Sequence, residues 1–282
     1  MLSYRHGYHA GNFADVFKHV VLMLLFDALH RKEKACVFID THAGAGDYDL
    51  QSAMALKNRE FETGIARIQR HSEQPEIVRR FLSSVGYNDG SASPRRYPGS
   101  PLQAFSRLRA QDRMLLFELH PAELGCLRAL FAGQRRVGVH PIDAYQGLKA
   151  FLPPPERRGL VLIDPAYERK DERARVTEGL LAAWTRWPTG MFAIWHPIVD
   201  RTTTDGWYRR LRRTEIGNML SLELRIEARH HADRMNSTGM IIVNPPWRLD
   251  TQLAALMPWL SSALSDEGGA SGWRIDWLTP AR

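Results

Sequence analysis

The feature that most constrains this chain is a buried strand that stops at an acid followed by proline. Residues 160–163 form an uninterrupted apolar run, which is typical of a strand in the middle of a sheet. Asp164 ends the run, and Pro165 prevents the strand from continuing because proline has no amide hydrogen for the ladder. In open α/β sheets, ligands bind at the carboxyl ends of such strands. The loop formed by Asp164, Pro165, Ala166 and Tyr167 is therefore the first candidate for a functional site.

The rest of the chain repeats this pattern of short apolar strands separated by helical periodicity. Strands are expected at residues 36–40, 114–118, 136–142, 160–164 and 191–195. Strands that alternate with helices predict an α/β fold with a doubly wound, mostly parallel sheet. Residues 220–226 and 240–243 are predicted to form a C-terminal antiparallel strand pair, followed by a helix over 250–264 and a tail around 273–278.

The domain organisation follows from one interruption of this alternation. Residues 50–97 contain helical patterns with no strand between them, which predicts a small helical insertion subdomain. The remaining residues, 1–49 and 98–282, are expected to form the main domain, in which 1–31 supply an N-terminal motif and a helix that starts near Asn12. The insertion is too poor in apolar residues to fold alone.

Composition limits the partners that this domain can have. The 282 residues include 44% hydrophobic residues and carry a net charge of +7, which favours an anionic partner. Arginine pairs recur along the chain, and although one pair indicates only solubility, the set favours nucleic acid. There is no apolar run long enough for a membrane span, no signal peptide and no disulfide framework. A cytoplasmic protein is expected, with Cys36 and Cys126 both in the core.

Acids and glycines gather at the predicted strand ends. Acids end four successive strands, which would crowd one edge of the sheet; these residues are Asp40, Glu118, Asp143 and Asp164. The first strand runs into a turn that contains His42, Gly44 and Gly46, and a glycine turn in this place favours a nucleotide-like ligand over an ordinary tight turn. Glu118 is placed to bind ribose hydroxyls. Asp143 is predicted both to accept an amine from an adenine and to cap helix 144–151.

Several further residues are candidates with a structural alternative. Ser100 and Pro101 fit the N-cap and first position of a helix, whose free N–H groups either bind an anionic group or are simply capped. Lys18 and His19 lie in the second turn of the first helix, where they are either structural or functional. The polar loop 229–236 could touch a substrate.

Taken together, the motifs identify a family. The chain resembles the 23S ribosomal RNA adenine N6-methyltransferases of the RlmJ type over nearly its whole length. The motifs that carry the resemblance are residues 1–6 (MLSYRH), 9–12 (HAGN), 40–46 (DTHAGAG), 97–101 (YPGSP), 164–167 (DPAY) and 239–247.

The resemblance implies a Rossmann-like class I methyltransferase that uses S-adenosylmethionine and acts on 23S rRNA. It implies cofactor contacts at His19, His42, Ser100, Glu118, Asp143, Ala144 and Asp164. It also implies that Tyr4, with His6 and Lys18, meets the RNA or target base. We expect a monomer that acts on rRNA before full ribosome assembly.

The chemistry fits the Asp164 loop. A nucleobase amine is a weak nucleophile that must be held in line with the methyl donor. Asp164 and the carbonyl of Pro165 can accept its two protons, and Tyr167 can stack on the base. The donor is already a good leaving group, so no metal is expected, and no metal-binding motif is present.

Two features weigh against an immediate assignment. The family's loop is normally Asp-Pro-Pro-Tyr, whereas Ala166 stands at the third position here, which loosens the loop. Residues 244–247 (NPPW) fit the amino-methyltransferase pattern better, but their strand lies late, in the antiparallel pair, so we interpret them as a rigid strand exit. The alternatives are a DNA adenine methyltransferase and an RNA-binding protein with a relict cofactor pocket.

Overall fold

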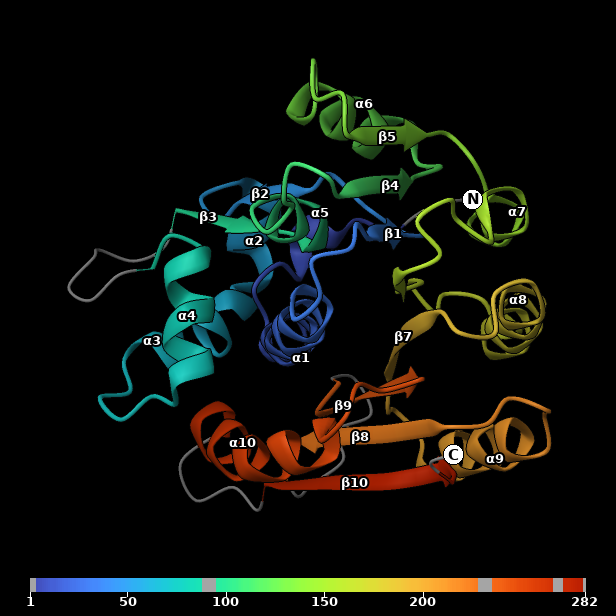
Figure 1. Ribbon diagram of the computed structural model, residues 1–282. Helices are drawn as coiled ribbons and strands as arrows, with labels where there is room; N and C mark the ends of the chain where they lie inside the picture. The colour runs from blue at the N-terminus through green and yellow to red at the C-terminus, as the bar shows by residue number, and fades with distance from the viewer. Residues whose placement is uncertain (1–3, 88–94, 228–234, 266–270, 281–282) are drawn as a thin grey trace.

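The computed structural model describes residues 4–87, 95–227, 235–265 and 271–280, which form one eight-stranded sheet with helices on both faces (Figure 1). The strand order is β10-β8-β9-β7-β6-β1-β4-β5. A short two-stranded ribbon, β2 with β3, accompanies it. The mostly parallel, doubly wound α/β sheet predicted from the sequence is confirmed.

The parallel half of the sheet is wound outwards from β1. Its strands are β1 (Val37–Asp40), β4 (Arg113–Phe117), β5 (Val137–His140), β6 (Gly159–Ile163) and β7 (Met191–Pro197). β1 pairs in parallel with β4 on one side and with β6 on the other. The winding therefore changes direction at β1, which is the topological switch point where α/β sheets bind ligands.

The C-terminal strands are antiparallel, and there is one more of them than expected. β9 (Ser237–Val243) pairs with β7 and with β8 (Met219–Arg225), as predicted for the closing pair. The segment expected to be a tail is strand β10 (Gly272–Thr279), which pairs with β8 along its length. Its position at the sheet edge explains the error, because Trp273 and Trp277 remain partly exposed and weaken the burial pattern.

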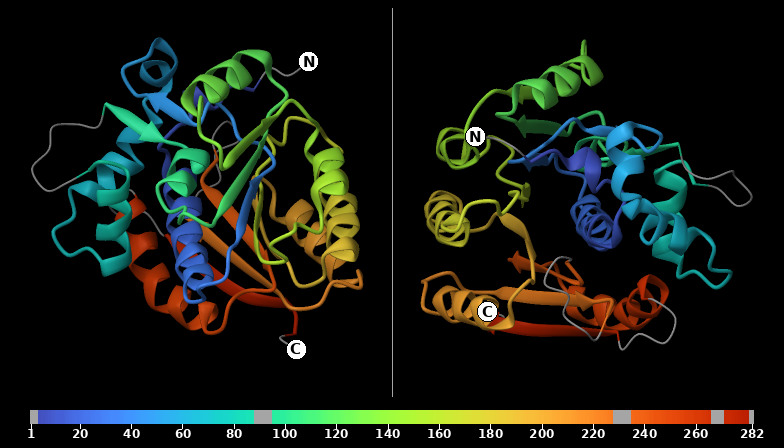
Figure 2. Two further views of the ribbon diagram at one scale, coloured as in Figure 1. Left: turned by 45° about the horizontal axis from the view of Figure 1, so that its top comes forward. Right: turned by 180° about the vertical axis from the view of Figure 1, so that it is seen from behind.

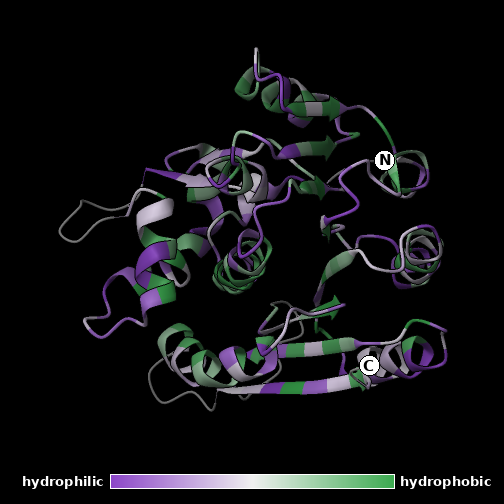
Figure 3. Cartoon of the chain, in the orientation of Figure 1, coloured by the Kyte–Doolittle hydropathy of each residue, from purple (hydrophilic) through white to green (hydrophobic). Residues whose placement is uncertain are grey.

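Two layers of helices cover the sheet (Figure 2). One face carries α1 (Phe13–His30), α5 (Ser100–Phe105), α6 (Pro121–Leu130) and α10 (Leu249–Leu264). The other carries α7 (Ala144–Phe151), α8 (Glu172–Arg186) and α9 (Arg201–Arg212). Successive residues of β6 alternate between the two cores, since Leu160 and Leu162 join the first and Val161 and Ile163 the second. Figure 3 shows the hydrophobic residues concentrated on the central strands and on α1.

The insertion consists of α2 (Ala53–Asn58), η2 (Glu60–Glu62), α3 (Ile65–Gln69) and α4 (Glu76–Ser84). The chain enters and leaves it through β2 (Asp47–Asp49) and β3 (Arg96–Pro98), two short strands that the sequence analysis did not predict. Most of its buried residues belong to the same hydrophobic core as α1.

Two smaller outcomes concern composition. Among the described residues, no helix combines the length and the apolar character needed to cross a bilayer. Cys36 is buried as expected, but Cys126 is exposed on α6, so the prediction that both thiols lie in the core was wrong for Cys126.

Candidate active site

The carboxyl ends of β1, β4 and β6 bring the predicted acids to one edge of the sheet. Asp40 is the last residue of β1, Glu118 follows β4 directly, and Asp164 follows β6 directly. Because these three strands are parallel neighbours, their ends share an edge at the switch point. We call it the carboxyl edge.

The glycine turn after β1 is tied to this edge through Glu118. Gly44 and Gly46 have φ angles of 59° and 80°, which L-residues with side chains rarely adopt. The Gly44 amide donates to Glu118 Oε2 at 2.7 Å, and the His120 amide donates to Oε1 at 2.7 Å. Burial raises the pKa of Glu118 although both amides stabilise its charged form. His42 lies in the same turn, and burial lowers its pKa to about 4, so its imidazole is neutral.

Ser100 reaches the same edge by a different route from the one predicted. Gly99, not Ser100, is the N-cap of α5, so the prediction of a Ser100 cap was wrong. The Ser100 hydroxyl instead donates to Asp40 Oδ2 at 2.6 Å. Asp40 is fully buried, and burial raises its pKa to about 7 despite that hydrogen bond. This hydrogen bond thus partly offsets the cost of burying the Asp40 carboxyl group, to which no cation is bonded among the described residues.

Asp143 caps α7, as expected. Its Oδ1 accepts from the amides of Tyr145 and Gln146 at 3.1 Å each. Its Oδ2 accepts from Arg175 at 3.2 Å, and Arg175 also lies over the ring of Tyr145. Ala144 is buried as the first residue of the helix. The cap role predicted for Asp143 is confirmed, and its role toward an adenine stays a prediction.

The loop after β6 holds Asp164 against a buried lysine. Lys18 Nζ lies 2.6 Å from Asp164 Oδ2, although these residues are 146 positions apart. Pro165 is buried and Ala166 is exposed. Tyr167 has a φ angle of 54°, and its hydroxyl donates to the carbonyl of Trp195 in β7 at 2.9 Å. The aromatic ring is therefore fixed by its far end.

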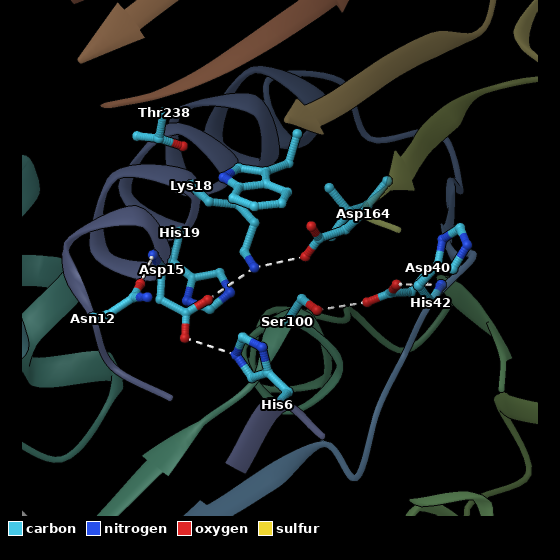
Figure 4. A network of polar contacts seen from close by, with 12 residues as sticks. His6, Asn12, Asp15, Lys18, His19, Asp40, His42, Ser100, Asp164 and Thr238 are labelled. Carbon is cyan, nitrogen blue, oxygen red and sulfur yellow. Dashed lines mark hydrogen bonds and ion pairs between the residues drawn. The ribbon is translucent and has the colours of Figure 1, made fainter. Parts of the chain in front are cut away.

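A chain of polar contacts continues from this lysine to the N-terminal segment (Figure 4). Lys18 Nζ also bonds Asp15 Oδ1 at 2.9 Å, and Asp15 Oδ2 lies 2.8 Å from His6 Nε2. His6 Nδ1 lies 2.9 Å from the hydroxyl of Tyr4, which is exposed. The structure thus brings Tyr4, His6 and Lys18 into one network, but Lys18 is buried and faces carboxylates, not the surface.

Among the described residues, His19 is a predicted cofactor residue whose buried ring nitrogen has no hydrogen-bond partner. Its Nδ1 lies 2.7 Å from the hydroxyl of Tyr97, whereas its Nε2 is buried and has no partner among the described residues. Burial and the charge of Lys18 hold the pKa of His19 well below its usual range. A buried ring nitrogen without a partner is costly, so a ligand or an ordered water is needed to bond it.

Known proteins that resemble this chain decide its family. A family model described as "Ribosomal RNA large subunit methyltransferase D, RlmJ" matches residues 33–279. The chain belongs to the RlmJ family. Two curated relatives named ribosomal RNA large subunit methyltransferase J match it over 99% of this chain and 100% of their own length. They come from Haemophilus influenzae at 43% identity and Escherichia coli K12 at 41% identity.

A solved structure supports the fold. The crystal structure of a Legionella pneumophila protein is 32% identical, covers 95% of this chain and 98% of its own, and superposes with a TM-score of 0.87. The chain is therefore a methyltransferase with a Rossmann-like class I fold, and the family predicted from the motifs is confirmed.

Asp15 and Trp195, two residues that contact Lys18, were not among the functional candidates from the sequence. Lys18 Nζ lies 5.8 Å from the centroid of the Trp195 ring, and the indole Nε1 is buried without a partner among the described residues. Only their proximity to other candidates in the folded protein distinguishes these two residues. The packing of α1 against β6 creates that proximity, so the sequence does not show it.

The second amino-methyltransferase motif lies at the opposite edge of the sheet. Val243 at the end of β9 pairs with Phe192 near the start of β7, because the two strands are antiparallel. Asn244 follows, and its side-chain amide donates to the carbonyls of Pro188 and Gly190 at 2.8 and 2.7 Å. The motif is thus a strand exit, and its amide is occupied far from Asp164.

Replacing Asn244 with alanine should therefore affect stability and not chemistry. The variant loses two hydrogen bonds, one to the carbonyl of exposed Pro188 and one to the carbonyl of buried Gly190, and must hold alanine at a φ of 53°. We expect the free energy of unfolding to fall by about 2 kcal/mol, measured by urea unfolding. A loss of methyl transfer in the folded variant would show that this loop, and not the Asp164 loop, is catalytic.

One cluster of possible metal ligands lies away from the carboxyl edge. Among the described residues, ligand atoms of His30, Cys36 and Asp112 lie within 4.8 Å of one another. However, Asp112 accepts from Arg109 at 2.8 and 2.9 Å and from the Cys36 amide at 3.0 Å. Burial and Asp112 raise the pKa of Cys36 to about 11, so the thiol stays protonated. We interpret the cluster as a structural ion pair.

Proposed function

We propose that this chain transfers a methyl group from S-adenosylmethionine to the N6 amine of an adenine in 23S rRNA. The names of the curated relatives support the RNA class and the reaction class. One observation in the structure carries the choice of an amine as acceptor. Asp164 Oδ1 and the Pro165 carbonyl oxygen accept no hydrogen bond from any described residue, while Oδ2 is held by Lys18. Two free acceptors on consecutive residues suit the two protons of an amine.

The residues around the carboxyl edge fit the methyl donor. The unpartnered Nε2 of His19 favours a close ligand. Glu118 would bind the ribose hydroxyls, and Asp143 with Ala144 would bind the adenine end of the cofactor. His42 and Ser100 would line the turn between them. When bound, this cofactor supplies a methyl group already activated on a positive sulfur.

The work of the protein is then to orient the amine and receive its proton. The lone pair of an exocyclic amine is delocalised into the ring, so positioning supplies much of the rate. Asp164 and the Pro165 carbonyl would hold the two N–H groups and favour a pyramidal nitrogen. Asp164 would accept the proton that the nitrogen loses on methylation. Tyr167, held by Trp195, would present its ring to the base.

RNA would approach through the N-terminal segment. Tyr4 is exposed beside the network that leads to Asp164. The net charge of +7 would attract phosphates, so activity should fall as salt rises. The target adenine must leave its stack to reach a carboxylate at a sheet edge, because the reacting atom of a paired base is inaccessible. We propose that a monomer acts on rRNA that still lacks most ribosomal proteins.

The purified protein should methylate protein-free rRNA at one adenine and leave DNA unmodified. The test incubates it with labelled S-adenosylmethionine and either protein-free rRNA or genomic DNA, and nucleoside mass spectrometry identifies the product. The same nucleoside should be missing from rRNA of cells that lack the gene and should return on complementation. Methylation of DNA alone would favour the DNA alternative. Binding of cofactor without methylation of either substrate would favour the relict pocket.

A further inference from the structure

Asp15 is a buried carboxylate that the proposed mechanism does not use. It lies in the first turn of α1 with 2% of its surface exposed. Oδ2 accepts from the Gly11 amide at 2.9 Å and lies 2.8 Å from His6 Nε2. Oδ1 accepts from Lys18 at 2.9 Å. The Gly11 amide and the Lys18 ammonium can only donate, and His6 donates when its Nε2 carries the proton, so these three partners suit an ionised carboxylate.

Lys18 is shared between Asp15 on its own helix and Asp164 on the loop after β6 (Figure 4). Burial alone would lower the pKa of Lys18, but the two carboxylates outweigh burial and raise that pKa above its usual value. Burial would likewise raise the pKa of Asp15, but His6 and Lys18 hold it well below its usual range. The ammonium therefore remains charged, and Asp15 remains an anion.

We propose that Asp15 is a positioning residue that holds Lys18 so that the ammonium bonds only one oxygen of Asp164. This inference rests on the proposed function, because its purpose is to keep Asp164 Oδ1 free for the target amine. Asp15 is also the point where the N-terminal segment, through His6 and Gly11, joins the catalytic loop. Asp15 thereby couples the docking of the N-terminal segment to the orientation of the Asp164 carboxylate.

The physical reason is the division of one buried positive charge. With two carboxylates beside it, Lys18 gives part of its hydrogen-bonding capacity and charge to each. Without Asp15, a buried ammonium would have Asp164 as its single anionic partner, and unpaired hydrogen-bonding capacity in a buried site is costly. It would then move onto both oxygens of Asp164 and compete with the amine. Because Asp15 remains ionised, it acts as a fixed charge and does not carry the proton released at nitrogen.

The first experiment replaces Asp15 with asparagine, which keeps the size and removes the charge. Single-turnover rates at saturating S-adenosylmethionine and rRNA should fall about 100-fold, since a displacement of order 1 Å at the reacting groups has this effect. Cofactor affinity by calorimetry should change less than about threefold, because none of the proposed cofactor contacts involves Asp15.

Asp27 provides the matched control. It lies on the same helix, about 18 Å further along the axis, and pairs with Arg80 at 2.8 Å and Arg107 at 3.2 Å. Asp27→Asn removes a carboxylate from ion pairs on α1 without approaching the carboxyl edge. Its rate should equal that of the unmodified protein. Equal losses in the two variants would show that Asp15 acts only through the stability of α1 and would overturn the proposal.

A double-mutant cycle with Lys18→Met keeps the test decisive if Asp15→Asn folds poorly. Removing both partners of a buried pair is tolerated better than removing one. In the Lys18→Met background, Asp15→Asn should lower the rate by less than about threefold, since there is no ammonium left to position. A further loss of about 100-fold there, or an Asp15→Asn variant as fast as the unmodified protein, refutes the inference. If the unmodified protein methylates no adenine, the proposed function fails instead.

Discussion

Replacing Asp164 with alanine should lower the rate of methyl transfer by about 1,000-fold, the size expected when a preorganised group that stabilises developing charge is lost. The change removes the free oxygen for the amine and the group that receives its proton. It also leaves Lys18 with Asp15 as its remaining anionic partner. The measurement is the single-turnover rate on protein-free rRNA at saturating S-adenosylmethionine, so that weaker cofactor binding does not contribute.

Asn244→Ala is the matched control for this prediction, because it truncates the first residue of the competing motif at the other edge of the sheet. It should retain the full rate at a temperature where it is folded. If Asp164→Ala keeps more than about a tenth of the rate while Asn244→Ala loses it, the catalytic loop has been assigned to the wrong edge.

The parallel core could be predicted from the sequence because its strands are buried on both faces. Such strands are continuous apolar runs, as in residues 160–163, and they end at turns that proline and glycine mark. The edge strand β10 and the ribbon of β2 and β3 were missed because they are short or partly exposed, so their burial pattern is weak. These strands are stabilised by pairing with a neighbouring strand, and the local sequence pattern does not show which strand that is.

The parts of the site that depend on the order of the parallel strands could be predicted from the sequence. Parallel neighbouring strands place their carboxyl ends together, so Asp40, Glu118 and Asp164 could be grouped without coordinates. The link from Lys18 to Asp164 could not, because it depends on how α1 packs against β6. Asp15 carried even less signal, since an acid in the first turn of a helix is favourable wherever the helix lies. The resemblance to the RlmJ family, not periodicity, singled out Tyr4 and His6.

Buried histidines should make this protein unusually sensitive to acid. Burial lowers the pKa of His42 to about 4 and that of His196, which also bonds the Tyr208 hydroxyl at 2.9 Å, to about 3; His19 lies well below its usual range. Below the ordinary pKa of 6.5, the unfolded chain binds protons at these sites and the folded chain does not. Their contribution to stability is therefore full above pH 6.5 and is lost as the pH falls toward the folded pKa values.

Asp40 has the opposite effect on how stability changes with pH, so it reduces the loss of stability caused by the histidines. Burial raises its pKa to about 7 from 3.8, so between pH 7 and 4 the folded state holds a proton that the unfolded state lacks, and stability rises as the pH falls. His42 and His196, with His19 shifted in the same direction, outnumber Asp40 and Glu118, whose pKa values are raised. The free energy of unfolding should therefore fall as the pH drops from 6 to 4, by about 1.4 kcal/mol per pH unit for each proton by which the unfolded chain exceeds the folded chain.

Urea unfolding at pH 7, 6, 5 and 4.5 measures this slope, and His196→Gln tests its origin. Glutamine keeps a polar group beside Tyr208 but does not titrate, so the slope below pH 6 should decrease by about one proton, or 1.4 kcal/mol per unit. His196 is fully buried and contacts neither Asp164 nor Lys18 through any described hydrogen bond, so the single-turnover rate at neutral pH should be unchanged. If the variant and the unmodified protein lose stability in parallel as the pH falls, His196 is protonated in the folded state and the acid sensitivity has another source.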